Sequence, residues 1–164
     1  MICCKQILLT ILATNLLFAQ PKQTWVDSTY QSLTLDEKIG QLFMPMVFSQ
    51  GDQNHYQQVF ADLKKFHLGG IIFSKGTTEE QARLTNLYQS ESKVPLLIAM
   101  DAEWGPAMRL DDVFAYPWNM TLGAIQDNMI VEDISKRIAQ QNKLLGIHYN
   151  FSPVVDVNSN PENP

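Results

Sequence analysis

The chain has 164 residues, of which 45% are hydrophobic and 18% charged, so it can bury a core, and its composition excludes a disordered or coiled-coil protein. Acidic residues outnumber basic ones by 17 to 12, without basic runs. This charge balance argues against binding to nucleic acid or to an anionic membrane through phosphate contacts. A neutral small molecule or a sugar is a more suitable ligand.

The first 19 residues predict a secretory signal peptide. Lys5 precedes an apolar stretch over residues 7–18, which is shorter than the roughly 20 apolar residues that a membrane span requires. Ala19 supplies the small residue that precedes a cleavage site, so we expect processing between Ala19 and Gln20. The alternative is a buried N-terminal helix, which Pro21 disfavours because proline interrupts helices.

Both cysteines of the chain, Cys3 and Cys4, lie inside this predicted leader. A processed chain therefore has no cysteine, which excludes a disulfide framework, thiol catalysis and a cysteine metal site. Loss of Lys5 leaves 11 basic residues against 17 acidic ones, a formal charge of −6. We expect an exported protein, periplasmic or secreted, with no membrane span.

Residues 20–33 are predicted to form a linker and an N-terminal helix, followed by the main domain over residues 34–164. The helix is indicated by apolar side chains at helical spacing between Thr24 and Leu33. Thr34 and Glu37 then have the spacing of a capping box, in which each side chain accepts a hydrogen bond from the other residue's backbone N–H. This pair predicts a short helix that continues to Leu42.

Amphipathic helices alternate with apolar runs through the rest of the chain. The strand-like runs occupy residues 68–73, 94–100 and 147–157, and helical spacing marks residues 56–66, 78–88 and 127–145. A further apolar run at residues 43–48 fits a buried strand as well as the end of a helix. Apolar strands that each follow an amphipathic helix are typical of parallel sheets, so we predict an α/β fold.

Periodicity alone leaves two α/β architectures open, an open doubly wound sheet and a (β/α)8 TIM-type barrel. A complete barrel takes about 250 residues. If the chain is a barrel, its four predicted strands are the N-terminal portion of one.

In parallel α/β folds ligands bind at the carboxyl ends of the strands, so residues after each apolar run are candidates for a site. Asp101 and Glu103 follow one such run, with Trp104 next and Arg109 a few residues on. On an extended exit from the strand, both carboxylates would face one cleft. Carboxylates, a guanidinium and an aromatic ring are what a sugar site needs, because they bind hydroxyl groups and cover the apolar face of the ring. The alternative is a structural ion pair between Asp101 and Arg109.

The sequence does not support a metal site or a cofactor. Asp156 and Asn158 have the spacing of part of a calcium loop, but Pro161 follows Asn160 where such a loop needs glycine. The three histidines are scattered along the chain. We expect neither metal nor cofactor.

Four motifs in order resemble the N-terminal domain of the family 3 glycoside hydrolases. They are L-T-L-D-E-K-I-G-Q-L-F at 33–43, G-G-I-I-F at 69–73, P-L-L-I-A-M-D-A-E-W-G at 95–105 and N-F-S-P-V-V-D-V-N-S-N-P at 150–161. The chain looks most like the β-N-acetylhexosaminidase branch, in particular an exported bacterial form that carries Trp after Asp-x-Glu. In that form a serine-hydrolase-like domain often follows.

The resemblance implies a (β/α)8 barrel and hydrolysis of terminal β-linked N-acetylhexosamine by a retaining mechanism. It implies that Asp101 and Arg109 bind substrate, that Glu103 has a structural role, and that the nucleophile and the acid/base lie beyond Pro164. The family often has Gly-Gly-Arg where this chain has Trp104-Gly105-Pro106, so that arginine is missing. A β-glucosidase of the same family and a non-catalytic sugar-binding protein are the alternatives. The sequence does not indicate an oligomeric state.

Overall fold

The computed structural model describes residues 22–156, 159–160 and 162. The chain divides into two compact units, residues 1–38 and 39–164. The predicted signal peptide at residues 1–19 lies outside the described residues. Within the described part, no helix is both long and apolar enough to cross a membrane.

The first unit contains helix α2 (Lys22–Ser32) and the start of helix α3 (Leu35–Gly40). The predicted capping box is confirmed: the backbone N–H of Thr34 donates to Glu37 Oε2 at 2.7 Å, and the N–H of Glu37 donates to Thr34 Oγ1 at 3.3 Å. Helix α3 ends at Gly40 rather than at the expected Leu42. Its start is set by local sequence, as the capping motif predicts.

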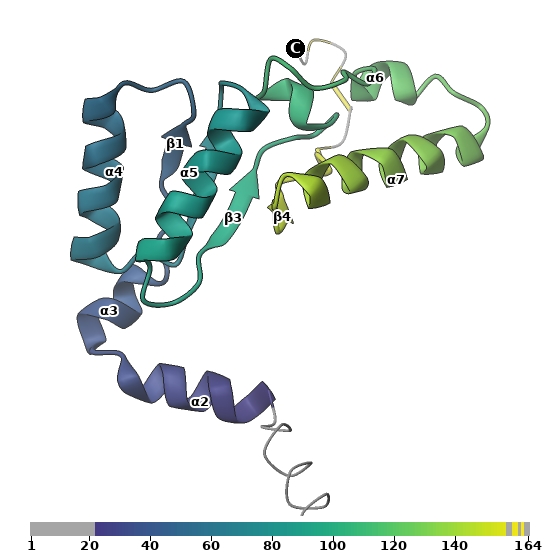
Figure 1. Ribbon diagram of the computed structural model, residues 1–164. Helices are drawn as coiled ribbons and strands as arrows, with labels where there is room; N and C mark the ends of the chain where they lie inside the picture. Colours follow the sequence, from purple (N-terminus) through teal and green to yellow (C-terminus); the bar gives the residue numbers. More distant parts are fainter. Residues whose placement is uncertain (1–21, 157–158, 161, 163–164) are drawn as a thin grey trace, which may run out of the picture. The chain divides into compact units, whose positions relative to one another are not determined.

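The second unit is an α/β structure built on four parallel strands (Figure 1). The strands lie side by side in chain order, as β1-β2-β3-β4. The elements are β1 (Met46–Phe48), α4 (Gln53–Phe66), β2 (Gly70–Ser74), α5 (Thr78–Glu91), β3 (Leu97–Met100), the 3-10 helix η1 (Pro106–Met108), α6 (Asn119–Leu122), α7 (Asn128–Leu144) and β4 (Tyr149–Asn150). The alternation of helix and strand is the predicted one, and the ambiguous run at 43–48 contains strand β1.

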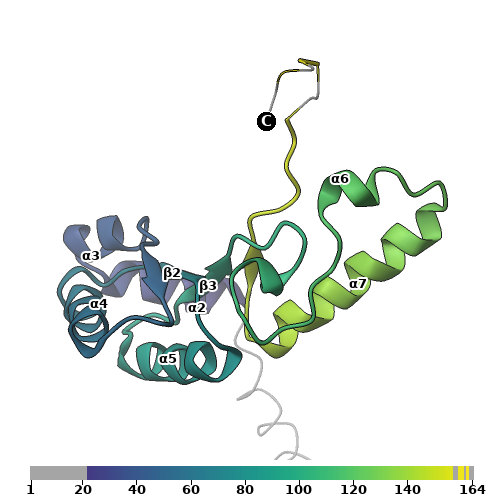
Figure 2. The same ribbon diagram turned by 90° about the horizontal axis from the view of Figure 1, so that it is seen from above.

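One face of the sheet forms the hydrophobic core with helices α4 and α5, which lie next to each other (Figure 2). Alternate strand residues point to this face, and Ile71, Phe73 and Ile98 are fully buried on it. Residues of the opposite parity point the other way, and Met46, Leu97 and Tyr149 are about half exposed. The second face is therefore only partly covered within the second unit, since Ala99 on it is buried.

Two glycines of the motif segments allow two stretches of backbone to approach closely. A Cβ atom on Gly40 would lie 1.7 Å from the carbonyl oxygen of Phe66, and one on Gly69 would lie 2.0 Å from the carbonyl oxygen of Gln41. The N–H of Gly69 donates to Gly40 O at 3.2 Å, and Gln41 Nε2 donates to His67 O at 2.6 Å. These contacts join the end of α3 to the segment that leads into β2.

The last strand is much shorter than expected. The apolar run at 147–157 was predicted to be strand-like throughout, but only Tyr149–Asn150 pairs as a strand. Strand β4 pairs with β3, whose last residue Met100 lies opposite Asn150. Beyond that point Phe151 N still donates to Met100 O of β3 at 3.0 Å, whereas Ser152 N donates back to Asn150 O at 2.9 Å. Val157 lies outside the described residues.

Candidate functional site

The ends of strands β2, β3 and β4 lie at one edge of the sheet, because neighbouring strands are parallel and in register. Phe73 pairs with Met100, and Met100 pairs with Asn150. The segments that follow these residues therefore emerge next to one another. Carboxyl ends of parallel strands are where α/β proteins bind ligands.

Asp101 and Arg109 come together at this edge and form the ion pair that is the alternative to a sugar-binding role in the sequence analysis. A guanidinium nitrogen of Arg109, Nη2, pairs with Asp101 Oδ2, and Arg109 Nε donates to the backbone carbonyl of Asp101 at 2.8 Å. The two side chains are partly exposed, 34% for Asp101 and 24% for Arg109. A carboxylate offers about four acceptor positions, so an ion pair at one oxygen leaves acceptor capacity for another partner.

Glu103 does not stand on an extended exit from the strand, in contrast to the sequence-based expectation. The chain turns at Glu103 and Trp104, and the turn is closed by a hydrogen bond from Gly105 N to Ala102 O at 3.1 Å. Gly105 has φ +108°, a value that favours glycine over any residue with a Cβ atom. The alternation of a strand therefore ends at Ala102, and it does not place Glu103 beside Asp101.

Asn150, on strand β4, forms two hydrogen bonds with the backbone just after the end of the neighbouring strand β3. Its Nδ2 donates to Ala102 O and its Oδ1 accepts from Ala102 N, both at 3.0 Å. Ala102 itself is fully buried. Asn150 is not among the candidates from the sequence, because it lies within the apolar run at 147–157 and not after it, although it begins the last motif.

Asp112 anchors the other end of the same loop. Its Oδ1 accepts from the backbone N–H of Thr78 at 2.8 Å, and its Oδ2 accepts from the hydroxyl of Thr78 at 2.7 Å. These hydrogen bonds, first of all the one from the hydroxyl, lower the pKa of the Asp112 carboxyl. Asp111 N also donates to Gly76 O at 2.9 Å. The loop from Asp101 to Asp112 is thus fastened to the exit of β2, to the first turn of α5 and to β4.

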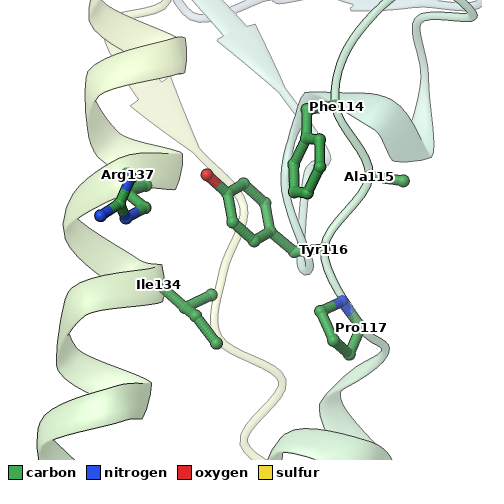
Figure 3. A pocket seen from close by; sticks show the side chains of 6 residues that line it. All are labelled: Phe114, Ala115, Tyr116, Pro117, Ile134 and Arg137. Carbon is green, nitrogen blue, oxygen red and sulfur yellow. The ribbon is translucent and has the colours of Figure 1, made fainter.

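A separate pocket of about 740 Å³ lies between residues 114–117 and helix α7. Figure 3 shows the Tyr116 ring between Phe114 and α7, with its hydroxyl toward Arg137. The rings of Phe114 and Tyr116 meet edge to face, with centroids 5.0 Å apart. Neither Asp101 nor Arg109 lines this pocket. Over the described ranges, no three His, Cys, Asp or Glu side chains are grouped so that they could hold a metal ion.

Four parallel strands in sequential order, alternating with helices, have the strand order of part of an α/β barrel, and a polar, ion-paired carboxylate lies at their carboxyl edge. The chain belongs to glycosyl hydrolase family 3, because the sequence model of the family's N-terminal domain matches residues 34–164. A solved structure of beta-glucoside phosphorylase BglX bound to 2FGlc superposes with a TM-score of 0.78 at 27% identity, over 88% of this chain and 26% of that one. The predicted fold, the N-terminal portion of a (β/α)8 TIM-type barrel, is confirmed.

Relatives of known activity are also similar to this chain. A beta-N-acetylglucosaminidase/beta-glucosidase from Cellulomonas fimi is 31% identical over 140 residues, which are 85% of this chain and 24% of the relative. Beta-hexosaminidase A from Pseudoalteromonas piscicida is 32% identical over 115 residues, 62% of this chain and 19% of that protein. The chain spans about a quarter or less of the length of these proteins.

Proposed function

We propose that this chain is the N-terminal part of an exported glycosidase that hydrolyses terminal β-linked N-acetylhexosamine, and that Asp101 and Arg109 bind the saccharide. The observation that carries the proposal is the partly exposed carboxylate of Asp101, held by Arg109 at the carboxyl edge of a parallel sheet. The family membership and the hexosaminidase relatives support the reaction class.

Asp101 is assigned to binding rather than to bond cleavage. The guanidinium of Arg109 already balances its charge, and a charge-paired carboxylate suits the acceptance of hydrogen bonds from sugar hydroxyls. A retaining mechanism needs a nucleophilic carboxylate and a second group that handles the proton. We place both of these groups beyond Pro164, and we assign no metal or cofactor to the reaction.

Two other activities within the family follow from particular relatives. The Cellulomonas fimi protein carries both activities in its name, so β-glucoside hydrolysis is the first alternative. The structural neighbour is a phosphorylase, so transfer of the glycosyl group to phosphate is the second. Turnover of 4-nitrophenyl β-N-acetylglucosaminide and β-glucoside by the complete enzyme, in buffers with and without phosphate, separates the three reactions. If the complete protein turns over neither glycoside, the remaining alternative is a non-catalytic sugar-binding protein.

Asp101→Asn in the complete enzyme tests the role of the carboxylate, because it removes the charge and nearly keeps the shape. Loss of a charge-assisted hydrogen bond to substrate costs about 1.5–3 kcal/mol. We therefore expect kcat/KM to fall by roughly one to two orders of magnitude, with little change in the melting temperature.

Asp133→Asn is the matched control, because Asp133 forms an exposed ion pair with Arg137 at 2.8 Å on helix α7. This variant should keep normal kcat/KM. A lowered melting temperature with normal kinetics in Asp101→Asn would instead indicate a structural ion pair, and unchanged kcat/KM would remove Asp101 from the site.

A further inference from the structure

Two side-chain amides bind the backbone at opposite ends of strand β3. At the amino end, Gln89 of α5 donates from Nε2 to Leu96 O and accepts at Oε1 from Leu96 N, both at 2.8 Å. At the carboxyl end, Asn150 makes the same pair of bonds with Ala102, both at 3.0 Å. The two amides make the same kind of contact, but only Asn150 lies at the edge of the candidate site.

The peptide group between Asp101 and Ala102 is held from two sides. Its carbonyl oxygen accepts from Arg109 Nε at 2.8 Å, and its N–H donates to Asn150 Oδ1 at 3.0 Å. A peptide unit is planar, so fixing both its oxygen and its hydrogen fixes the orientation of the whole plane. The Cα atom of Asp101 lies between that plane and the preceding peptide plane, whose carbonyl oxygen, Met100 O, accepts from Phe151 N at 3.0 Å. With both flanking planes held, the direction of the Cα–Cβ bond of Asp101 is fixed.

We propose that Asn150 is a positioning residue for Asp101, which acts by holding this peptide plane and not by contact with the substrate. The inference rests on the proposed role of Asp101 in saccharide binding. A group held about 1 Å out of place can lower a rate about a hundredfold, so an oriented carboxylate needs a rigid backbone beneath it. Arg109 reaches the carbonyl through a flexible side chain, whereas Asn150 lies on the neighbouring strand.

The test is a double-mutant cycle in the complete enzyme, with kcat/KM on 4-nitrophenyl β-N-acetylglucosaminide and the melting temperature measured for every variant. Asn150→Ala should lower kcat/KM at least tenfold when Asp101 is present. In the Asp101→Asn background, the same change should lower kcat/KM by less than threefold, because the group that Asn150 orients has already lost its function.

Gln89→Ala is the matched control, because it removes the same two kinds of hydrogen bond from the same strand. Both alanine variants should lower the melting temperature, and only Asn150→Ala should lower kcat/KM. Equal kinetic effects of the two variants, or an equal effect of Asn150→Ala in both backgrounds, would overturn the positioning role.

Asn150→Asp provides a second route if the alanine variant does not fold. It keeps the size and the acceptor for Ala102 N–H, but its carboxylate has no proton to donate to Ala102 O until it is protonated. Because the bond that it keeps is the one that holds the peptide plane of Asp101, its kcat/KM should stay close to that of the unaltered enzyme, and a loss as large as the one expected for Asn150→Ala would contradict the inference. If Asp101→Asn alone leaves kcat/KM unchanged, the proposed function fails; if that variant is impaired and the cycle is additive, only the role of Asn150 fails.

Discussion

Gly40→Ala tests whether close backbone approach between the end of α3 and the entry to β2 holds this part of the fold. The added Cβ would lie 1.7 Å from Phe66 O, whereas real Cβ atoms essentially never come within 3.0 Å of a neighbour. The obstacle is backbone, so no side-chain rotation relieves it. The two segments must separate by about 1.3 Å.

The separation also affects the hydrogen bonds that cross the gap. The bond from Gly69 N to Gly40 O is already 3.2 Å long, and the added separation would break it. Overpacking costs about 1–3 kcal/mol and a lost hydrogen bond about 1 kcal/mol, so we expect a loss of roughly 2–4 kcal/mol. For a domain of 150–250 residues this corresponds to a melting temperature lowered by roughly 4–16 °C.

Two other glycines serve as controls for the same chemical change. Gly123 ends helix α6 with φ −64°, and a Cβ there meets nothing nearer than 3.5 Å, so Gly123→Ala should be neutral or stabilise by about 0.4–1 kcal/mol. Gly146 has φ +68° with no atom within 4 Å, so Gly146→Ala should cost only the strain of the left-handed conformation, about 1–2 kcal/mol.

Urea unfolding of the three variants of the complete enzyme, followed by circular dichroism, gives the comparison. The expected order of destabilisation is Gly40→Ala, then Gly146→Ala, then Gly123→Ala. If Gly40→Ala is no more destabilising than Gly146→Ala, the end of α3 and the entry to β2 can separate at little cost. Close backbone approach is then not the reason for a glycine at position 40.

Two further predictions concern the loop anchor and the N-terminus. Hydrogen bonds from Thr78 lower the pKa of the Asp112 carboxyl in the folded state. Asp112 should therefore stabilise the fold at pH values above its ordinary pKa of about 4. This stabilisation should be lost as the pH falls through the lowered pKa of the folded state. The difference in melting temperature between the unaltered enzyme and Asp112→Ala should shrink over that range, and a difference independent of pH would contradict the assignment. N-terminal sequencing of exported protein should begin at Gln20, and a sequence beginning at Met1 would exclude the predicted processing.

Features encoded by neighbouring residues could be predicted from the sequence. The capping box of Thr34 and Glu37 needs only four residues, and Arg109 lies eight residues from Asp101, within one loop. Helix α5 begins at Thr78 as expected, but its N-cap is Thr77, whose side chain accepts from Glu80 N at 3.3 Å. The hydroxyl of Thr78 is bound to Asp112, 34 residues away, and local sequence carries no sign of that contact.

Features that depend on a neighbouring strand could not be predicted in the same way. An apolar run shows that a segment can form a strand, but the length of the strand depends on its partner. Strand β4 ends where β3 ends, so nine of the eleven residues of the run at 147–157 are not assigned to a strand or lie outside the described residues. The bond between Asn150 and Ala102 spans 48 residues and needs the register of the sheet, so only the structure reveals it.

The side-chain amides of Gln89 and Asn150, at the two ends of β3, also fix the position of this strand along the strand direction. A strand that slides in its sheet must move by two residues, roughly 6.6 Å, to keep each side chain on its face. Such a slide would break the bonds of Gln89 and of Asn150 together, although the ladder with β2 could re-form between shifted partners. The level at which the chain leaves the sheet toward Asp101 is therefore set by α5 and β4 as well as by the ladder with β2.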